Sequence, residues 1–173
     1  MFDGVSLFNT AHPLSKSQSG TTVSNRPASE VDVSIAGLDA ARVNLVTQYA
    51  ANGVERLQND PRLLVINPSQ YRVAAQCVKG DWERATADRN KNIIPEYGFE
   101  IVEWAYFTKS GSTGTNNAWF VVDQTHSLMK IMRQEFRMLS DTDIKTASYI
   151  FVADQRFDVG ATDFRGTYGS VGI

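Results

Sequence analysis

Residues 61–78 read PRLLVINPSQYRVAAQCV, and this stretch predicts a strand, a turn and a helix in succession. Leu63 to Ile66 form a continuous apolar run with β-branched residues, as expected of a strand buried on both faces. Asn67 can cap the following helix, and Pro68 suits its first position because no N–H is needed there. The expected buried face of this helix comprises Tyr71, Ala74, Ala75 and Val78.

A second helix is predicted upstream, within VDVSIAGLDAARVNLVTQYAANG. Its apolar positions follow the spacing of three and four residues that marks one buried helical face. These positions are Ile35, Leu38, Ala41, Leu45 and Tyr49. Ser34 is the expected N-cap and Asn52-Gly53 the expected end, which gives a helix over residues 35–52.

The second half of the chain is mostly strand in character. Aromatic and β-branched segments at 99–107 and 118–123 flank TKSGSTGTNN, a tip of small polar residues. Residues 127–139 predict a strand, with a short helix as the alternative, and residues 141–170 predict a long strand that ends in a glycine-punctuated segment. Residues 79–98 predict a long loop, with a short helix at 82–87 as an option. The order of elements indicates the α+β class.

The first 27 residues, MFDGVSLFNTAHPLSKSQSGTTVSNRP, have no helical or strand periodicity. They nevertheless carry the apolar residues Phe2, Val5, Leu7, Phe8 and Leu14. Disordered tails are poor in such residues, because these side chains gain nothing in water. We therefore expect an ordered loop that packs onto another surface, on this chain or on a neighbour.

Composition excludes several classes of protein. The hydrophobic fraction of 42% and the charged fraction of 21% are near globular averages, so the 173 residues can build a core. A net charge of −2 gives no electrostatic footprint for nucleic acid. No apolar run approaches the roughly 20 residues of a membrane span. The single cysteine, Cys77, cannot form an internal disulfide and fits a reducing compartment.

Residues able to carry chemistry are few and scattered. His12 and His126 lack the ligand spacing of a zinc site, so we expect one to hydrogen-bond within its loop and the other to lie in a turn before a strand. Cys77 lies on an apolar helix face and is expected to be a small core residue. No nucleophile-elbow, phosphate-loop or dinucleotide-binding motif is present.

Two carboxylate pairs and a group of aromatic residues also have ordinary structural interpretations. The pairs are Asp141 with Asp143 and Glu100 with Glu103, and both are expected to be solvated. The aromatic residues Trp104, Tyr106, Trp119 and Phe120 have no basic patch around them. A sheet core therefore explains these aromatic side chains better than base stacking does.

Four segments, taken in order and at their separations, carry a resemblance to a known family. They are DGVSLFNTAHPL (3–14), LLVINPSQYRVAA (63–75), AWFVVD (118–123) and RFDVGATDFRGTYGS (156–170). Together they resemble the C-terminal portion of a tailed-bacteriophage major capsid protein, the head subunit, of the prophage or Mu-like variety. The resemblance runs from about Asp3 to Ser170.

The resemblance implies an α+β fold of the tailed-phage major capsid type, with an axial domain and part of a peripheral domain. Residues 1–66 would form a peripheral loop and helix, 67–139 the axial domain, and 140–173 long strands that return to the peripheral domain. The family's N-terminal arm and extended hairpin loop are expected to be absent. The chain would then be a fragment or a shortened relative.

The resemblance also implies a structural role without catalysis or cofactor. The expected protein is a subunit of an icosahedral head that associates with copies of itself in pentamers and hexamers, is made in the bacterial host cytoplasm and ends in the virion capsid. Scaffold, portal or decoration proteins are further expected partners, whereas sequence-specific nucleic acid and membranes are not. The candidate subunit contacts are Phe8, Trp82, Arg84, Arg89 and Lys109.

Two alternatives stay open on the sequence alone. A cellular compartment shell can share the capsid fold, because a fold does not fix a role. A small α+β enzyme or ligand-binding domain would need a deep pocket with convergent polar groups.

Overall fold

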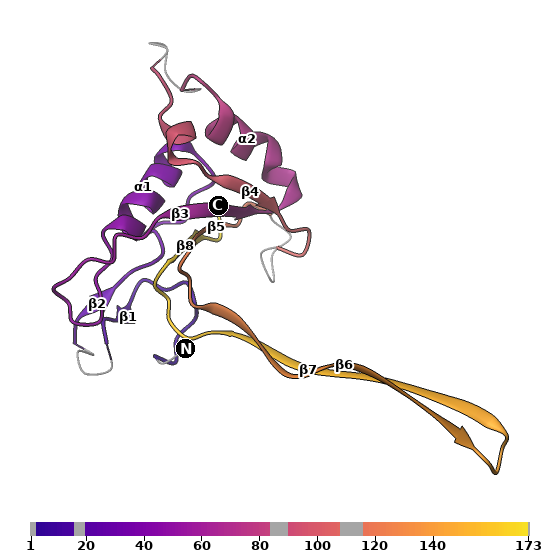
Figure 1. Cartoon of the computed structure of the whole chain (residues 1–173). Coiled ribbons are helices and arrows are strands. Elements are labelled where there is room, and N and C mark those ends of the chain that lie inside the picture. Colours follow the sequence, from indigo (N-terminus) through magenta and orange to yellow (C-terminus); the bar gives the residue numbers. More distant parts are fainter. Residues whose placement is uncertain (1–2, 16–19, 84–89, 108–115, 173) are drawn as a thin grey trace. The chain divides into compact units, whose positions relative to one another are not determined.

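The computed structural model describes residues 3–15, 20–83, 90–107 and 116–172 (Figure 1). The chain divides into two compact units. The first, called the body here, comprises Met1–Ser127 and Asp163–Ile173, and the second comprises Leu128–Thr162. These boundaries differ from the three ranges expected from the sequence. Those ranges refer to the peripheral and axial domains of a capsid subunit, and they stay a prediction.

Helices and strands alternate irregularly along the chain, as the α+β prediction requires. In order, they are β1 (His12–Pro13), β2 (Thr22–Val23), α1 (Ile35–Val46), β3 (Pro61–Ile66), the 3-10 turn η1 (Pro68–Gln70), α2 (Tyr71–Lys79), the 3-10 turn η2 (Ile94–Tyr97), β4 (Glu100–Glu103), β5 (Trp119–Asp123), β6 (Leu128–Asp143), β7 (Ser148–Ala161) and β8 (Thr167–Ser170). The predicted strand, turn and helix over residues 61–78 are therefore confirmed. The predicted tip at 108–117 and the optional helix at 82–87 lie mostly outside the described residues.

A four-stranded sheet in the order β4-β3-β5-β8 forms the centre of the body. β3 runs parallel to β4 and antiparallel to β5, and β8 is antiparallel to β5. Leu64 and Ile66 are fully buried, whereas Leu63 and Val65 on the other face are only partly buried. The strand is thus buried completely on one face, because α1 and α2 lie on the same side of the sheet (Figure 1).

Helix α1 begins as its sequence predicts and ends earlier. The Ser34 hydroxyl accepts a hydrogen bond from the Gly37 N–H at 3.1 Å, which confirms the N-cap. The helix stops at Val46, where side chains from the following turn take up its last carbonyls: Asn59 Nδ2 donates to the Leu45 carbonyl and Arg56 to the Thr47 carbonyl. Tyr49 consequently leaves the helical face on which it was expected and is 37% exposed.

Helix α2 packs through a narrow apolar stripe. Asn67 Oδ1 accepts from the Ser69 N–H at 3.0 Å and so caps η1, which runs directly into α2. Ala74 and Val78 are buried as expected, whereas Tyr71 in the first turn is exposed.

The described part of the N-terminal segment packs against the body's own sheet. Buried Asn25 holds it in place: its Nδ2 donates to the Leu7 carbonyl at 2.7 Å, and its Oδ1 accepts from the Asn9 N–H at 2.9 Å. The Phe8 ring lies 5.5 Å from the Phe120 ring, centroid to centroid. Phe8 and buried Leu14 therefore find a surface on the same chain, whereas Val5 is exposed and Phe2 lies outside the described residues.

The second unit is a two-stranded antiparallel hairpin of β6 and β7. The register shifts twice, between Met132 and Gln134 and between Gln134 and Arg137. Each shift adds a residue to β6 and none to β7, so side chains along β7 keep regular alternation between the two faces. The strand prediction for residues 127–139 is confirmed, and the helical alternative is wrong. No helix in the described part of the chain is long and apolar enough to cross a membrane.

Glu30 joins the segment before α1 to the end of β8, and its titration makes a prediction. Its Oε2 accepts from the Ser170 hydroxyl at 2.8 Å and from the Val171 N–H at 2.7 Å, and Arg26 Nε donates to Oε1. Burial raises the pKa of Glu30, but these hydrogen bonds and the Arg26 charge together lower it by more. The net shift of the pKa is therefore downward from 4.5. The stability that Glu30 contributes is therefore present above pH 4.5 and is lost as the pH falls through the lowered pKa.

We expect Glu30→Gln to lower the free energy of unfolding at pH 7 by about 1–2 kcal/mol, because hydrogen bonds to a charged group are lost. The difference between variant and wild type should shrink between pH 5 and pH 3. Urea denaturation across this pH range measures both quantities. Glu55→Gln changes an exposed carboxylate of the turn at 48–57 and is the matched control. A pH-independent difference for Glu30→Gln would contradict the assignment.

Candidate functional site

The hairpin exposes large apolar side chains along its whole length. A ribbon of two strands has no interior in which to bury them, and isolated two-stranded hairpins are marginally stable in water. The exposed set is Met129, Ile131, Met132, Phe136, Met138, Leu139, Ile144, Tyr149, Ile150, Phe151, Val152, Phe157 and Val159. Exposed apolar groups in this number on one element are typical of a surface that contacts another molecule.

One face of the ribbon concentrates the aromatic residues. Tyr149, Phe151, Phe157 and Val159 alternate along β7, so they share a face. Met132 pairs with Phe157 across the ribbon and belongs to the same face. Tyr149 and Phe151 are 75% and 68% exposed. We call these five residues the apolar face of the hairpin.

The opposite face carries a polar cluster at the point where β6 bulges. Arg137 donates to Asp154 through two nitrogens, Nε at 2.6 Å and a terminal nitrogen at 3.1 Å, and Gln134 Nε2 donates to the same carboxylate at 2.8 Å. The hydrogen bond from Arg137 holds the pKa of Asp154 below its usual value. This cluster joins the two strands across the irregular part of the register.

The hairpin ends in a turn that its own side chains hold. Asp143 accepts hydrogen bonds from the Lys145 N–H at 2.9 Å and from the Thr146 hydroxyl at 2.8 Å, which hold the pKa of Asp143 below 3.8. Ala147 closes the turn with φ of 50°. Ile144 projects from this turn and is 93% exposed, more than any other large apolar side chain in the described part of the chain.

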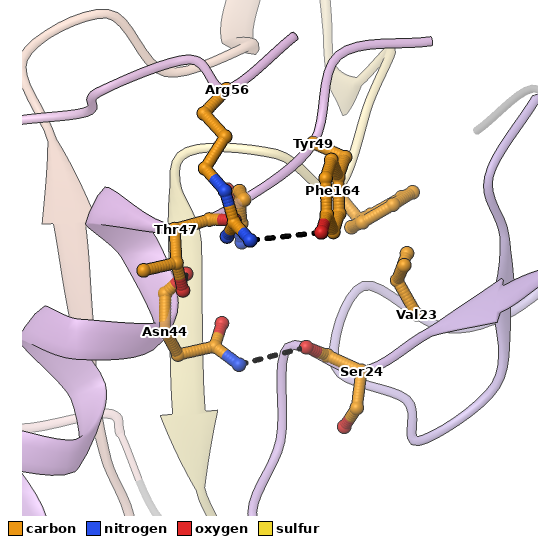
Figure 2. Close-up of a pocket in the computed structure, with 8 residues that line it drawn as sticks. Val23, Ser24, Asn44, Thr47, Tyr49, Arg56 and Phe164 are labelled. Atoms are coloured by element: carbon orange, nitrogen blue, oxygen red, sulfur yellow. Dashed lines mark hydrogen bonds between the residues drawn. The ribbon is translucent and has the colours of Figure 1, made fainter. Parts of the chain in front are cut away.

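The body carries a small pocket at the C-terminal end of α1, which we call the α1 pocket (Figure 2). Its volume is about 230 Å³. Val23 and Ser24 contribute one wall, the last turn of α1 with residues 47–49 contributes another, and Phe164 and Arg56 complete the lining. These segments are distant in the sequence, and the turn after α1 brings them together.

Two polar atoms on residues that line the α1 pocket have no hydrogen-bond partner among the described residues: Asn44 Oδ1 and Gln48 Nε2. Other bonds fix the orientation of each amide. Asn44 Nδ2 donates to the Ser24 carbonyl at 3.2 Å, a bond drawn in Figure 2. Gln48 Oε1 accepts from the Asn59 amide at 2.9 Å and from the Gly166 N–H at 3.0 Å. The pocket wall therefore holds one unused acceptor and one unused donor, each costing about 1–3 kcal/mol while unpaired.

Arg56 lies at the rim of the α1 pocket. Its guanidinium donates to the Thr47 carbonyl at 2.5 Å and to the Tyr49 hydroxyl at 2.8 Å (Figure 2), and lies 4.3 Å from the centroid of the Tyr49 ring. Among the described residues, Arg56 has no carboxylate within ion-pair distance. The rim thus carries a positive charge that is held in place and unneutralised.

A second pocket, of about 420 Å³, lies beside the Phe8 and Phe107 rings and the end of β8. The nearby aromatic residues correct part of the sequence prediction. Trp119 is fully buried in the core, whereas Trp104 and Tyr106 are 49% and 87% exposed. β4 ends at Glu103, and the Phe107 N–H donates to the Trp104 carbonyl to form a turn, in which the Trp104 and Tyr106 side chains are exposed.

The predicted subunit contacts are residues of the body and not of the hairpin. Phe8 is partly buried against Phe120, and Trp82 is 62% exposed next to the isolated bridge with Lys91. Arg84, Arg89 and Lys109 lie outside the described residues. All five stay predictions. The apolar face has a sequence signal that was passed over: large apolar residues at every second position around 149–151 and 157–159.

The residues examined for chemistry have structural partners. His12 is fully buried, lies 2.6 Å from Asp3 Oδ2 and 3.1 Å from Asn25 Oδ1, and stacks on Phe164. Its predicted hydrogen bonding within the loop is confirmed. His126 is exposed in the loop before β6, and Cys77 is partly buried against the core. Within the described ranges, no three metal-ligating side chains come together.

Comparison with known proteins gives one family. The family model described as phage capsid protein matches residues 3–170, which is nearly the whole chain. No curated protein matches the sequence.

The backbone amides of the two units should exchange hydrogen at different rates in the monomeric chain. We expect the hydrogen-bonded amides of β6 and β7 to exchange at least tenfold faster than those of β3 and β5, because the ribbon has no buried face. Exchange monitored by NMR or mass spectrometry at low protein concentration gives the comparison. Equal protection of hairpin and sheet in a monomeric sample would contradict the view that the hairpin lacks a partner.

Proposed function

The chain belongs to the phage capsid protein family, and on that premise we propose that it is a subunit of an icosahedral head that binds copies of itself through its hairpin. The family assigns a structural role and a place in the virion capsid. The single observation that carries the proposal of self-association is the exposed apolar face of the hairpin. A two-stranded ribbon has no interior in which to bury these side chains.

The hairpin has the length and the apolar area that a contact between subunits needs. A strand of 16 residues spans about 50 Å at roughly 3.3 Å per residue, enough to lie across a neighbouring subunit. Burying each large side chain of the apolar face would contribute about 1.5–3 kcal/mol. Several such side chains from each copy suffice for the large apolar interfaces of obligate assemblies.

Contacts between a hairpin on one copy and a different surface on the next are head-to-tail. Contacts of this kind close into rings when the rotation between copies allows it, and pentamers and hexamers are such rings. We infer that the chain forms them, with scaffold, portal or decoration proteins as further partners, and that it is made in the bacterial host cytoplasm. The Mu-like variety and the axial and peripheral ranges belong to the same proposal.

A ligand-binding domain is the second candidate. The pocket beside Phe8, at about 420 Å³, falls within the roughly 300–1,000 Å³ of small-molecule sites. A compound that binds there in a chain that stays monomeric at all concentrations would favour this candidate. A cellular shell of the same fold would be distinguished by a cargo peptide bound on its inner surface.

The experiment that tests the proposal replaces one aromatic residue of the apolar face. We expect Phe151→Asp or Tyr149→Asp to lower the fraction of chain in heavy species at least tenfold, because a charge would be buried in the interface. Light scattering across a concentration series, with negative-stain images of the heavy fraction, measures assembly. Circular dichroism checks that the fold is kept.

Tyr106→Asp is the matched control, since Tyr106 is an exposed aromatic residue of the body outside the hairpin. This variant should assemble like the wild type. Wild-type assembly by both hairpin variants would refute the proposed role of the apolar face.

A further inference from the structure

We propose that the α1 pocket of one copy receives the hairpin turn of a second copy, with Ile144 entering the pocket and Asp141 approaching Arg56. This inference rests on the proposed function, since it needs copies of the chain to associate. It names the contact that the turn at the end of the hairpin makes, whereas the proposed function concerns the apolar face along the two strands.

The size of the pocket fits one residue of a polypeptide. Its volume of about 230 Å³ is below the roughly 300 Å³ at which small-molecule sites begin. The same volume is several times the approximately 30 Å³ that one water occupies. An apolar side chain with its adjoining peptide group lies between these limits.

The walls divide into an apolar and a polar part. Val23 and Tyr49 offer hydrocarbon and aromatic surface, and Figure 2 labels both among the residues that line the pocket. A large apolar side chain projecting from a turn would fill that part. Ile144 has this form, because it is 93% exposed at the end of the hairpin.

The two unpaired polar atoms would take one main-chain donor and one main-chain acceptor, which come from two different peptide groups because the N–H and C=O of one trans peptide point in opposite directions. An incoming main-chain N–H can donate to Asn44 Oδ1, and an incoming carbonyl can accept from Gln48 Nε2. Both residues line the same pocket. Turns offer main-chain groups that are not part of a strand ladder, which suits this pairing.

Charge favours the same occupant. Arg56 at the rim has no described carboxylate partner, and the hairpin carries Asp141 and Asp143 beside Ile144. Asp143 is occupied in holding the turn, so Asp141, which is exposed and bonded to the neighbouring Thr142 N–H, is the free acid. An arginine and an aspartate at the edge of a contact steer association and fix its register.

Disulfide trapping between differently labelled copies tests the contact. In a Cys77→Ala background of the full chain, Ile144→Cys is placed in one copy and Val23→Cys in a second copy labelled with nitrogen-15. A disulfide forms only where the two Cα atoms come within about 7 Å. Mild oxidation of the mixed assembly, followed by mass spectrometry without reduction, should give at least five times more mixed dimer than the control pair.

The control pair combines Ile144→Cys with Val54→Cys. Val54 is 80% exposed in the same turn as Arg56 and does not line the pocket. Thr47→Cys, which lines the pocket from another side, replaces Val23→Cys if that variant is destabilised. A yield for the pocket pair no higher than for the control overturns the inference, and it would mean that the pocket holds water or another segment.

A charge exchange gives the second readout. Arg56→Glu in the Val23→Cys copy should lower the yield of mixed dimer at least threefold, and Asp141→Arg in the Ile144→Cys copy should restore it. No loss, or no restoration, overturns the pairing of these residues. If heavy species form but no pocket disulfide appears, the inference alone fails; if no heavy species form at any concentration, the proposed function fails with it.

Discussion

A ribbon of two β-strands has no interior, so the side chains on both of its faces stay in contact with water unless another surface covers them. In this chain the ribbon of β6 and β7 carries aromatic residues at alternate positions of β7, where a polar sequence would serve an isolated hairpin better. The Arg137–Asp154 pair and the Asp143 turn hold its shape from within. Neither of them buries an apolar group, so the hairpin leaves its large apolar side chains exposed within the described chain.

The body, unlike the hairpin, buries its apolar side chains within the chain. Both helices cover one face of a four-stranded sheet, and the core formed by Leu38, Leu64 and Trp119 is fully buried within the chain. Asn25 and Glu30 tie the N-terminal segment and the end of β8 to this core through hydrogen bonds. The body buries its own core, whereas the hairpin leaves its apolar side chains exposed. This arrangement suits a shell subunit, which must fold before it contacts its neighbours.

Local sequence signals predicted the parts of the fold that depend on local interactions. The Ser34 cap, the apolar stripe through Leu38 and Leu45, and the strand before Asn67 each follow from neighbouring residues, and each is present. The end of α1 was missed because it depends on Arg56 and Asn59, which lie later in the chain and donate to its last carbonyls. The resemblance found in four separate segments agreed with the family match over residues 3–170.

The surfaces proposed for assembly could not be predicted in the same way. The α1 pocket joins residues from β2, α1 and the loop before β8, and no spacing rule links these segments. The pairing of β6 with β7 depends on a long-range register, although the alternation along β7 was readable.

The most direct test of the central claim is oxidative footprinting of Tyr149 in the monomeric and assembled fractions of the wild-type chain, with Tyr106 as the internal reference. Covering of the apolar face by a neighbouring copy predicts that Tyr149 reacts at least fivefold more slowly in the assembled fraction, while Tyr106 changes little. Equal reactivity of Tyr149 in both fractions would contradict the account, because the hairpin would then remain uncovered in the shell.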